Sequence, residues 1–466
     1  MSGVVMFVFN DCTTDARVLR EAGSLAAAGH QVTIMARPRD PVSPTGDREV
    51  RDGFEIVRVP IPHRWVAWWV WARFPWRARW WLHEQLQDAF ADLPMSLFRA
   101  TGAVLLAVVA LPWIALRVSW WLLVGRSRAA RRRPTGGRLL EWLARWRLAT
   151  LGWARAAAVA APDAAVYHGH DLTALPAAMW AAEARAAHLV YDSHEIFLES
   201  GVNAARPGWA RAMLARVERR GIARADALVT VNEALAEELS RRYEPRRVLI
   251  VRNCPPRWTP PDPRPELIRN ATGIPGTSPI ALYHGGFSLH RGLETFAAAL
   301  LEPGLEAVHA VYLGYGALRP MLDKLARDSR FGGRLHVLDA VPPEELLPWI
   351  ASADVGIMTS LPSTLNHLLA TPNKLFECLA AGVPVVASDF PLLRRVILEN
   401  PDGPLGVVCD PADVASVGAA IRSIMTSDPA ALARLRQRCL AAAHHRWNWE
   451  TEVAGLLDLY AELDPA

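Results

Sequence analysis

The sequence VVMFVFNDCTTDARVLREAGSLAAAGHQVTIMA, residues 4–36, decides the fold class. It begins with a continuous apolar run, residues 4–9, which is typical of a strand buried on both faces of a sheet. Apolar residues then recur with a helical period through residues 16–28, and Gly29 closes this helix. A second strand begins at residue 31. We therefore predict the strand–helix–strand unit of an α/β protein with a parallel sheet.

Similar units recur along the chain in two series. We expect the further strands at residues 165–167, 189–191, 227–231 and 248–251, and then at 280–283, 310–313, 335–337, 355–357 and 383–387. Between the two series, residues 255–265 hold six prolines in eleven positions, which suits a hinge between domains. We predict two successive doubly wound domains, residues 1–254 and 279–446, joined by a hinge at residues 255–278.

The charge of the chain is unevenly distributed. Of its 466 residues, 51% are apolar and 21% charged, which excludes a disordered or fibrous protein. The net charge is only +4, but residues 62–155 alone carry +11, from 15 arginines against four acidic residues. The same stretch holds 13 of the 19 tryptophans. We interpret it as a basic, tryptophan-rich insert in the first domain of an otherwise mildly acidic chain.

The insert, residues 62–155, suits the surface of a membrane better than a span across it. Its most apolar part, residues 100–125, is long enough to cross once. The strands at residues 4–9 and 165–167 share a sheet, however, so the chain must return to the side that it left. Pro112 divides the segment into two arms of about a dozen residues, each ~18–20 Å long if helical and too short to span. We expect re-entrant or interfacial helices facing anionic lipid; the alternative is a helical subdomain whose tryptophans pack against the protein.

Other features narrow the class of function. The five cysteines form no C-x-x-C pair, and their odd number and the lack of a signal peptide favour a reducing cytoplasm. Residues 10–15 follow the first strand without a G-x-G-x-x-G motif, which counts against a dinucleotide-dependent oxidoreductase. No D-x-D occurs in the chain, so we expect no bridging metal ion and no cofactor. We expect no nucleic acid as a partner.

A glycine-rich segment of the second half, YHGGFSLHRG at residues 283–292, joins a strand to a helix. Glycines and a cation at a helix N-terminus form an anion site, because backbone N–H groups and a guanidinium converge there. Gly285, Gly286 and Arg291 are therefore candidates for binding phosphate, and a plain turn with a surface arginine is the alternative. Gly314, in a Gly-Tyr-Gly sequence after the next strand, is a further candidate.

The richest stretch is TPNKLFECLAAGVPVVASD, residues 371–389. A polar segment opens a helix that has Lys374 in its first turn and Glu377 soon after, and Gly382 ends the helix before a buried strand. A cation at a helix N-terminus is electrostatically unfavourable, so Lys374 requires a reason such as a phosphate partner. Glu377 is placed to accept hydrogen bonds from ribose hydroxyls.

This stretch resembles the signature of the retaining nucleotide-sugar glycosyltransferases of glycosyltransferase family 4, which have the GT-B fold of two facing Rossmann-like domains. The resemblance covers most of the chain except the insert, through NDCTTDARVLREAGSLAAAGHQVT (10–33), HGHDL (168–172), VYDSHE (190–195) and HGGFSLHRGLETF (284–296). It implies that a hexose-type sugar is transferred, with retention, from a nucleotide diphosphate donor. It also implies a C-terminal helix, residues 447–466, that returns to the first domain.

The resemblance assigns roles to individual residues. Glu377 matches the ribose-binding glutamate, Arg291 the basic residue at the diphosphate, and His194 the histidine near the transferred sugar and acceptor. We expect catalysis to depend on His194, Lys374 and Glu377. The expected donor-binding residues are Gly285, Gly286, Arg291, Gly314, Asn373, Lys374 and Glu377. The residues expected to line the acceptor side are Asn10, Asp15, His168, His170, Asp171, Glu195 and Asn366, although Asp171 could simply cap the helix that follows it and His194 could satisfy a local turn.

Two positions depart from the family pattern. Leu369 stands where a second glutamate is usual, and Gly286 where an arginine is usual; Asn366, His367, Thr371 or Lys374 could supply the missing contacts. We expect a lipid-linked or polysaccharide acceptor and an enzyme held at the inner face of the plasma membrane. One alternative is a sugar-nucleotide epimerase of the same architecture. The other is a catalytically silent membrane subunit, for which Leu369 is the best argument.

Overall fold

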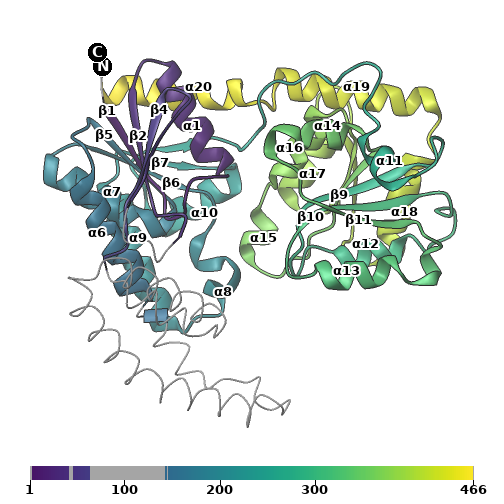
Figure 1. The fold of residues 1–466 in the computed structure, drawn as a ribbon, viewed down its shortest axis with the longest axis horizontal. Coiled ribbons are helices and arrows are strands. Elements are labelled where there is room, and N and C mark those ends of the chain that lie inside the picture. Colours follow the sequence, from purple (N-terminus) through teal and green to yellow (C-terminus); the bar gives the residue numbers. More distant parts are fainter. Residues whose placement is uncertain (1–2, 41–45, 63–141, 144, 465–466) are drawn as a thin grey trace, which may run out of the picture.

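The computed structural model describes residues 3–40, 46–62, 142–143 and 145–464, which form two α/β domains side by side (Figure 1). Each domain is a sheet of mainly parallel strands with helices on both faces. The central strands are short apolar runs, as expected where both faces of a sheet are covered. The predicted α/β class with two Rossmann-like domains is confirmed.

The sheet of the first domain has the order β3-β4-β2-β1-β5-β6-β7-β8 within the described residues, and only β3 is antiparallel to its neighbour. Its strands are β1 (Gly3–Phe7), β2 (Gln31–Ala36), β3 (Arg48–Arg51), β4 (Phe54–Arg58), β5 (Val166–His170), β6 (His188–Ser193), β7 (Ala227–Thr230) and β8 (Val248–Ile250). Its helices are α1 (Ala16–Ala27), α6 (Leu151–Ala160), α7 (Asp171–Arg185), α8 (Gly201–Ala204), α9 (Gly208–Arg224) and α10 (Glu233–Tyr243), with short turns at Arg145–Thr150 and Phe197–Glu199.

Two apolar layers cover this sheet. On one face, α1 packs together with the last helix of the chain, α20 (Trp449–Leu463). On the other face lie α6, α7 and α9, and α7 contributes a row of small buried alanines that lets these helices approach the strands closely. Because β1, β5 and β6 are central strands, their carboxyl ends meet at one edge of the sheet, where ligands bind in open α/β folds.

The second sheet is parallel throughout, with the order β11-β10-β9-β12-β13-β14. Its strands are β9 (Ile280–Gly286), β10 (His309–Tyr315), β11 (Leu335–Asp339), β12 (Val355–Met358), β13 (Val385–Ser388) and β14 (Gly406–Cys409). The helices α11 (Leu267–Thr272), α14 (Leu346–Ala351), α16 (Asn373–Ala380), α17 (Pro391–Leu398) and α19 (Pro429–His445) cover one face. The other face is covered by α12 (Leu293–Ala299), α13 (Arg319–Ala326) and α18 (Val414–Met425), and α15 (Leu365–Leu369) lies toward the first domain (Figure 1).

The structure draws two boundaries differently from the sequence prediction. The insert was expected to extend to residue 155, but residues 145–160 belong to the core of the first domain. Trp153 is fully buried there, and its indole nitrogen donates to the carbonyl of Ala36 over 3.3 Å. The hinge was expected at residues 255–278, but α11 lies within that range and buries Ile268 in the second core. Each segment has an apolar side chain, Trp153 or Ile268, that packs into a domain core. Burying it there is more favourable than exposing it in a linker.

The remainder of the predicted membrane insert, residues 63–141 and residue 144, lies outside the described part of the chain. Within the described part, no helix combines the length and the apolar character that crossing a bilayer requires. Whether the insert forms a hairpin at a membrane stays a prediction.

The chain crosses between the domains twice, and the two crossings lie against each other. The first follows β8, and the second joins α19 on the second domain to α20 on the first (Figure 1). The backbone N–H of Trp449 donates to the carbonyl of Pro255 over 2.9 Å. The indole of Trp449 donates to Ser24 of α1 over 2.9 Å. Trp449, Val453, Leu456, Leu459 and Tyr460 are buried on the first domain.

Replacing Leu456 should test how much the returning helix stabilises the first domain. Leu456 is fully buried, so Leu456→Ala should lower the free energy of unfolding by about 2–5 kcal/mol through lost burial and the cavity left behind. Leu301→Ala, at a leucine that is 43% exposed, is the matched control and should change it by much less. Urea denaturation measures both, and equal losses would show that α20 contributes little to the core.

Candidate functional site

In the second domain, the backbones of β9 and β10 are in close contact at the carboxyl ends of the two strands. Gly285 pairs in register with Gly314, and Gly314 has φ +158°, at which a Cβ atom would lie 2.0 Å from the carbonyl oxygen of Gly285. A side chain is therefore excluded at this position. Gly285 itself has a φ of +107°, a conformation that glycine adopts without strain. Of these predicted donor-binding glycines, Gly314 is buried against Gly285, Gly285 is partly exposed, and Gly286 is exposed.

Lys374, at the start of α16, lies next to Gly285. Its Nζ atom lies 3.8 Å from the centre of the Tyr283 ring, and a Cβ atom at Gly285 would lie 3.7 Å from it. Within the described residues Lys374 forms no ion pair with a carboxylate. Burial, together with the positive charge of Arg291, lowers the pKa of Lys374 to about 7. The lysine is therefore a cation held on an aromatic face without a counter-ion in hydrogen-bond contact.

Glu377 lies one turn further along α16 and is fixed by His284 of β9. The His284 Nε2 and Glu377 Oε2 atoms are 2.9 Å apart, and His284 is almost completely buried. Burial alone would raise the pKa of Glu377, but the hydrogen bond from His284 and the charges of Lys374 and Arg20 outweigh it and lower this pKa. Glu377 is thus an ionised carboxylate in a fixed orientation, with its second oxygen left to accept hydrogen bonds.

The other two predicted donor-side residues are less constrained. Arg291 precedes α12, and its Nε atom is 3.5 Å from the hydroxyl of Ser288. Its charge reaches both Lys374 and Tyr283, since it lowers the pKa of each. Asn373 is exposed at the first position of α16. The structure therefore places Arg291, Lys374 and Glu377 together, as the sequence predicts for a diphosphate and a ribose.

On the first domain, His194 follows β6 and lies between two carboxylates. Its Nδ1 atom is 3.4 Å from Asp171 Oδ2, and its Nε2 atom is 3.1 Å from Asp192 Oδ2. Its backbone N–H also points to Asp171, over 3.3 Å. Burial alone would lower the pKa of His194, but Asp171 and Asp192 outweigh it and raise this pKa well above its ordinary value. Asp171 is the first residue of α7, and it holds His194 instead of serving as the helix cap.

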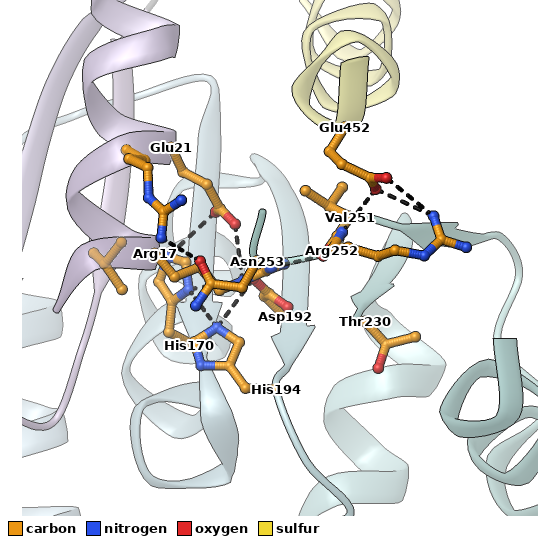
Figure 2. Close-up of polar contacts among 12 residues, drawn as sticks. Arg17, Glu21, His170, Asp192, His194, Thr230, Val251, Arg252, Asn253 and Glu452 are labelled. Atoms are coloured by element: carbon orange, nitrogen blue, oxygen red, sulfur yellow. Dashed lines mark hydrogen bonds and ion pairs between the residues drawn. The ribbon is translucent and has the colours of Figure 1, made fainter. Parts of the chain in front are cut away.

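A buried ion-pair network lies behind His194 (Figure 2). Arg17 of α1 contacts Asp192 through its Nε atom at 2.8 Å and Glu21 at 3.0 Å, and it donates to the carbonyl of Val251 over 2.6 Å. His170 Nδ1 lies 3.5 Å from the same oxygen of Asp192. Although burial opposes it, the charges of Arg17 and His194 hold the pKa of Asp192 well below its usual range. Burial raises the pKa of Glu21 to about 7, against the opposing effect of Arg17.

Four residues of this region, Glu21, His168, His170 and Asp192, have ligand-type atoms within 4.8 Å of one another. Both carboxylates are already bound by the Arg17 guanidinium, however, and a divalent cation would be placed beside that fixed positive charge. We therefore interpret the group as an ion-pair network and not as a metal centre.

Several residues predicted to line the acceptor side have other roles. His168 is fully buried and bonded through Nδ1 to the hydroxyl of Tyr460 in α20, at 2.8 Å; it therefore does not line the cleft. His170 is also buried and supports Asp192 from behind. Asn10 donates to Asp15 over 2.8 Å, and Asp15 caps α1. His168 and His170 are thus buried inside the protein, whereas Asn10 and Asp15 are partly exposed, and their role on the acceptor side stays a prediction.

The two domains touch through side chains near this site. Asn366 of α15 accepts from the backbone N–H of Ile196 over 3.1 Å and donates to Glu195 over 3.2 Å. Asn232 donates to the carbonyl of Leu369 over 3.0 Å and to Thr371 over 3.2 Å. Leu369, which stands where the family has a glutamate, thus contributes its backbone carbonyl to the contact between the domains. Asn366 and Thr371, candidates to replace that glutamate, are engaged in the same contact.

The sequence did not reveal the residues that support the site. Arg17, Glu21 and Asp192 lie within quoted motifs, but without a structure nothing distinguished them from surface charges. His284 was quoted as part of the glycine-rich segment, and its partner Glu377 is 93 positions away. A charged pair at i and i+4 inside an apolar helix face, as for Arg17 and Glu21, was the one signal that could have indicated a buried network.

Two family models match the chain in succession. The description "Glycosyl transferase 4-like domain" matches residues 126–254, and "Glycosyl transferases group 1" matches residues 278–427. Among characterised relatives, D-inositol 3-phosphate glycosyltransferase of Xylanimonas cellulosilytica is 31% identical over 314 residues, which cover 64% of this chain and 72% of the relative. Glycogen synthase of Mycobacterium tuberculosis is 27% identical over 314 residues, covering 64% and 68%.

Solved structures show the same fold at low sequence identity. Sucrose-phosphate synthase of Thermosynechococcus elongatus superposes with a TM-score of 0.66 at 17% identity, covering 99% of both chains. HepE of Anabaena, solved with UDP and glucose, superposes with a TM-score of 0.62 at 12% identity, covering 99% of this chain and 100% of that one. With its two matched domains and this degree of identity, the chain belongs to the glycosyl transferases group 1 (glycosyltransferase family 4), and it is a GT-B enzyme that transfers a sugar from a nucleotide donor.

Proposed function

We propose that the enzyme transfers a hexose-type sugar from a nucleoside diphosphate donor, with retention at the anomeric carbon, to an acceptor presented at a membrane surface. The observation that carries the donor assignment is Lys374, a partly buried cation that lies beside Gly285 and has no ion-paired carboxylate within the described residues. A diphosphate there would supply the counter-charge that the described residues do not. Arg291 adds a second cation, and Glu377 is oriented to accept from a ribose.

In this proposal the protein stabilises the departing diphosphate and needs no covalent chemistry of its own. Negative charge develops on the leaving phosphate, and Lys374 and Arg291 are positioned to stabilise it. The acceptor hydroxyl loses its proton to that phosphate on the face from which it departs, so the configuration is retained. Retention is supported by the family to which the chain belongs. The intact grouping of Lys374, His284 and Glu377 favours an active enzyme over the silent subunit considered from the sequence.

The acceptor and the location rest on the insert. Its tryptophans and arginines support an acceptor that is lipid-linked or a growing polysaccharide, with the enzyme at the inner face of the plasma membrane. A soluble phosphorylated acceptor is the competing possibility, since one relative is named a D-inositol 3-phosphate glycosyltransferase.

Transfer should be tested directly with a panel of radiolabelled nucleotide sugars, in membrane extracts and with soluble sugar phosphates. We expect label to enter a membrane-bound product with one of the donors. Glu377→Ala should abolish most of this incorporation, because a charge-assisted contact to the donor is lost, worth about 1.5–3 kcal/mol. Glu399→Ala, at an exposed glutamate, is the control. Incorporation only into a soluble product would refute the membrane acceptor, and none with any donor would refute transfer.

Binding of the donor should depend on pH through Lys374. A nucleotide sugar has no group that titrates near neutrality, whereas Lys374 is charged below a pKa of about 7 and neutral above it. The affinity should therefore be constant in acid and fall as pH rises through 7, by up to tenfold per pH unit. Calorimetry of the tightest donor from pH 6 to 9 measures this.

Three variants sharpen the test. Lys374→Met should bind weakly at every pH, without the slope, and Lys324→Met, at the only other lysine of the chain, should behave as wild type. Arg291→Ala should move the midpoint to higher pH, since Arg291 is one of the charges that lower the pKa of Lys374. A slope that persists in Lys374→Met would assign the titration to another group.

Binding to membranes should combine an apolar and an electrostatic part. We expect the protein to sediment with vesicles that contain anionic lipid and to be weakened, but not released, by high salt, because burial of apolar groups is not screened. Replacing Arg126, Arg128, Arg131, Arg132 and Arg133 by glutamine should cost about 1 kcal/mol for each residue near the surface. Neutral vesicles serve as the comparison. Protein that stays wholly in the supernatant with anionic vesicles would favour the packed-subdomain interpretation.

A further inference from the structure

His194 has no ring nitrogen left for a substrate. Nδ1 faces Asp171 at 3.4 Å, and Nε2 faces Asp192 at 3.1 Å. The side chain is 21% exposed, and Figure 2 shows it beside Asp192 and His170. A neutral imidazole has one N–H and one lone pair. Only the imidazolium can donate to both carboxylates at once. Nε2 also lies 3.3 Å from Nδ1 of His170, so the charged form requires that this nitrogen of His170 carries no proton and faces the Nε2–H as an acceptor.

We propose that His194 is a permanently charged imidazolium at the floor of the acceptor side, and that Arg17 is a positioning residue that holds it there through Asp192. Arg17 is only 3% exposed, so it does not reach a substrate. Its NH1 atom is fixed by the carbonyl of Val251, and its Nε atom lies 2.8 Å from the Asp192 oxygen that also contacts His194. The strand end of β8 is thereby linked to the orientation of the imidazole on β6.

The charges around His194 come from four elements and favour its protonated form. Asp171 lies at the start of α7, and Asp192 on β6. Burial raises the pKa of the next residue along, Glu195. His170 of β5 has its Nδ1 atom 3.3 Å from His194 Nε2, and Arg17 and Glu21 of α1 lie behind Asp192. Burial alone would lower the pKa of His194, but the two carboxylates in direct contact outweigh it and raise this pKa.

A fixed imidazolium at His194 excludes a role as the catalytic base. It cannot take the proton of an acceptor hydroxyl, because both of its nitrogens already carry protons that are bound by carboxylates. On the proposed transfer function, the departing phosphate can take the acceptor proton and His194 cannot. Two residues after His194, the backbone N–H of Ile196 donates to Asn366 of the second domain.

The protonation of His194 can be measured in the free, full-length protein, independently of any glycosyl transfer. Protein labelled with 15N-histidine is titrated from pH 6 to 8.5 and observed by NMR through the ring nitrogens of its 14 histidines. The resonances that disappear in His194→Gln assign the residue. We expect both ring nitrogens of His194 to stay protonated throughout. A neutral ring at pH 7 in the wild-type protein would overturn the proposal.

Variants test the clamp and its support separately. Asp192→Asn should lower the pKa of His194 by more than about one unit, as loss of an adjacent opposite charge does, so that titration appears within the range. Asp226→Asn is the matched control, since Asp226 lies 3.2 Å from the ring of His188, and it should leave the resonances of His194 unchanged. Arg17→Met should shift those resonances, and Arg17→Lys should restore them toward wild type.

Each outcome tests one part of the proposal. Unchanged His194 resonances in Arg17→Met would refute the positioning role of Arg17 while leaving the clamp intact. An unchanged pKa of His194 in Asp192→Asn would refute the clamp. If a variant does not fold, the wild-type titration still decides whether His194 is charged. Failure of the transfer assay with every donor would concern the proposed function and leave this result unaffected.

Discussion

The arrangement of the first domain at the carboxyl ends of its central strands depends on the carboxylate of Asp192. It is fully buried, and an ionised group in that position is tolerated only when cations and hydrogen-bond donors surround it. Arg17 comes from α1, His170 from β5 and His194 from the segment after β6, and all three reach the same side chain. Three elements that are distant in sequence therefore have to be in register before this edge of the sheet has a defined shape.

The cations of the two domains have different surroundings. On the first domain, His194 and Arg17 each contact two carboxylates. On the second domain, Lys374 rests on the ring of Tyr283, and it forms no ion pair with a carboxylate of the described residues. Partial burial and the nearby charge of Arg291 lower the pKa of Lys374 to about 7. The cations of the first domain are thus paired within the protein, whereas on the proposed function the charge of Lys374 is paired by the donor.

Sequence reasoning predicted the elements and the local motifs, because strand and helix signals and the Lys374–Glu377 helix start are contiguous in the chain. It did not predict the pairs that join distant segments. Arg17 and Asp192 are 175 positions apart, and Tyr460 and His168 are 292 apart, so no periodicity connects them. For the same reason His168 was taken for a lining residue: a histidine on a strand end has the same local pattern whether it faces the cleft or a returning helix. Trp153 was assigned to the membrane insert because composition cannot distinguish a tryptophan at a lipid interface from one against a sheet.

The paired crossings between the domains have a mechanical consequence. Arg252, just after β8, binds Glu452 of α20 through its backbone N–H at 2.9 Å and through its guanidinium at 3.2 Å. Arg257 reaches back to Glu450 in the same way, at 3.1 Å from its backbone N–H. A single linker would leave the domains free to twist as well as to bend. Two linkers joined side by side by these contacts resist twisting more than a single linker would, so the residues around Pro255 and Trp449 help to set how the two domains face each other.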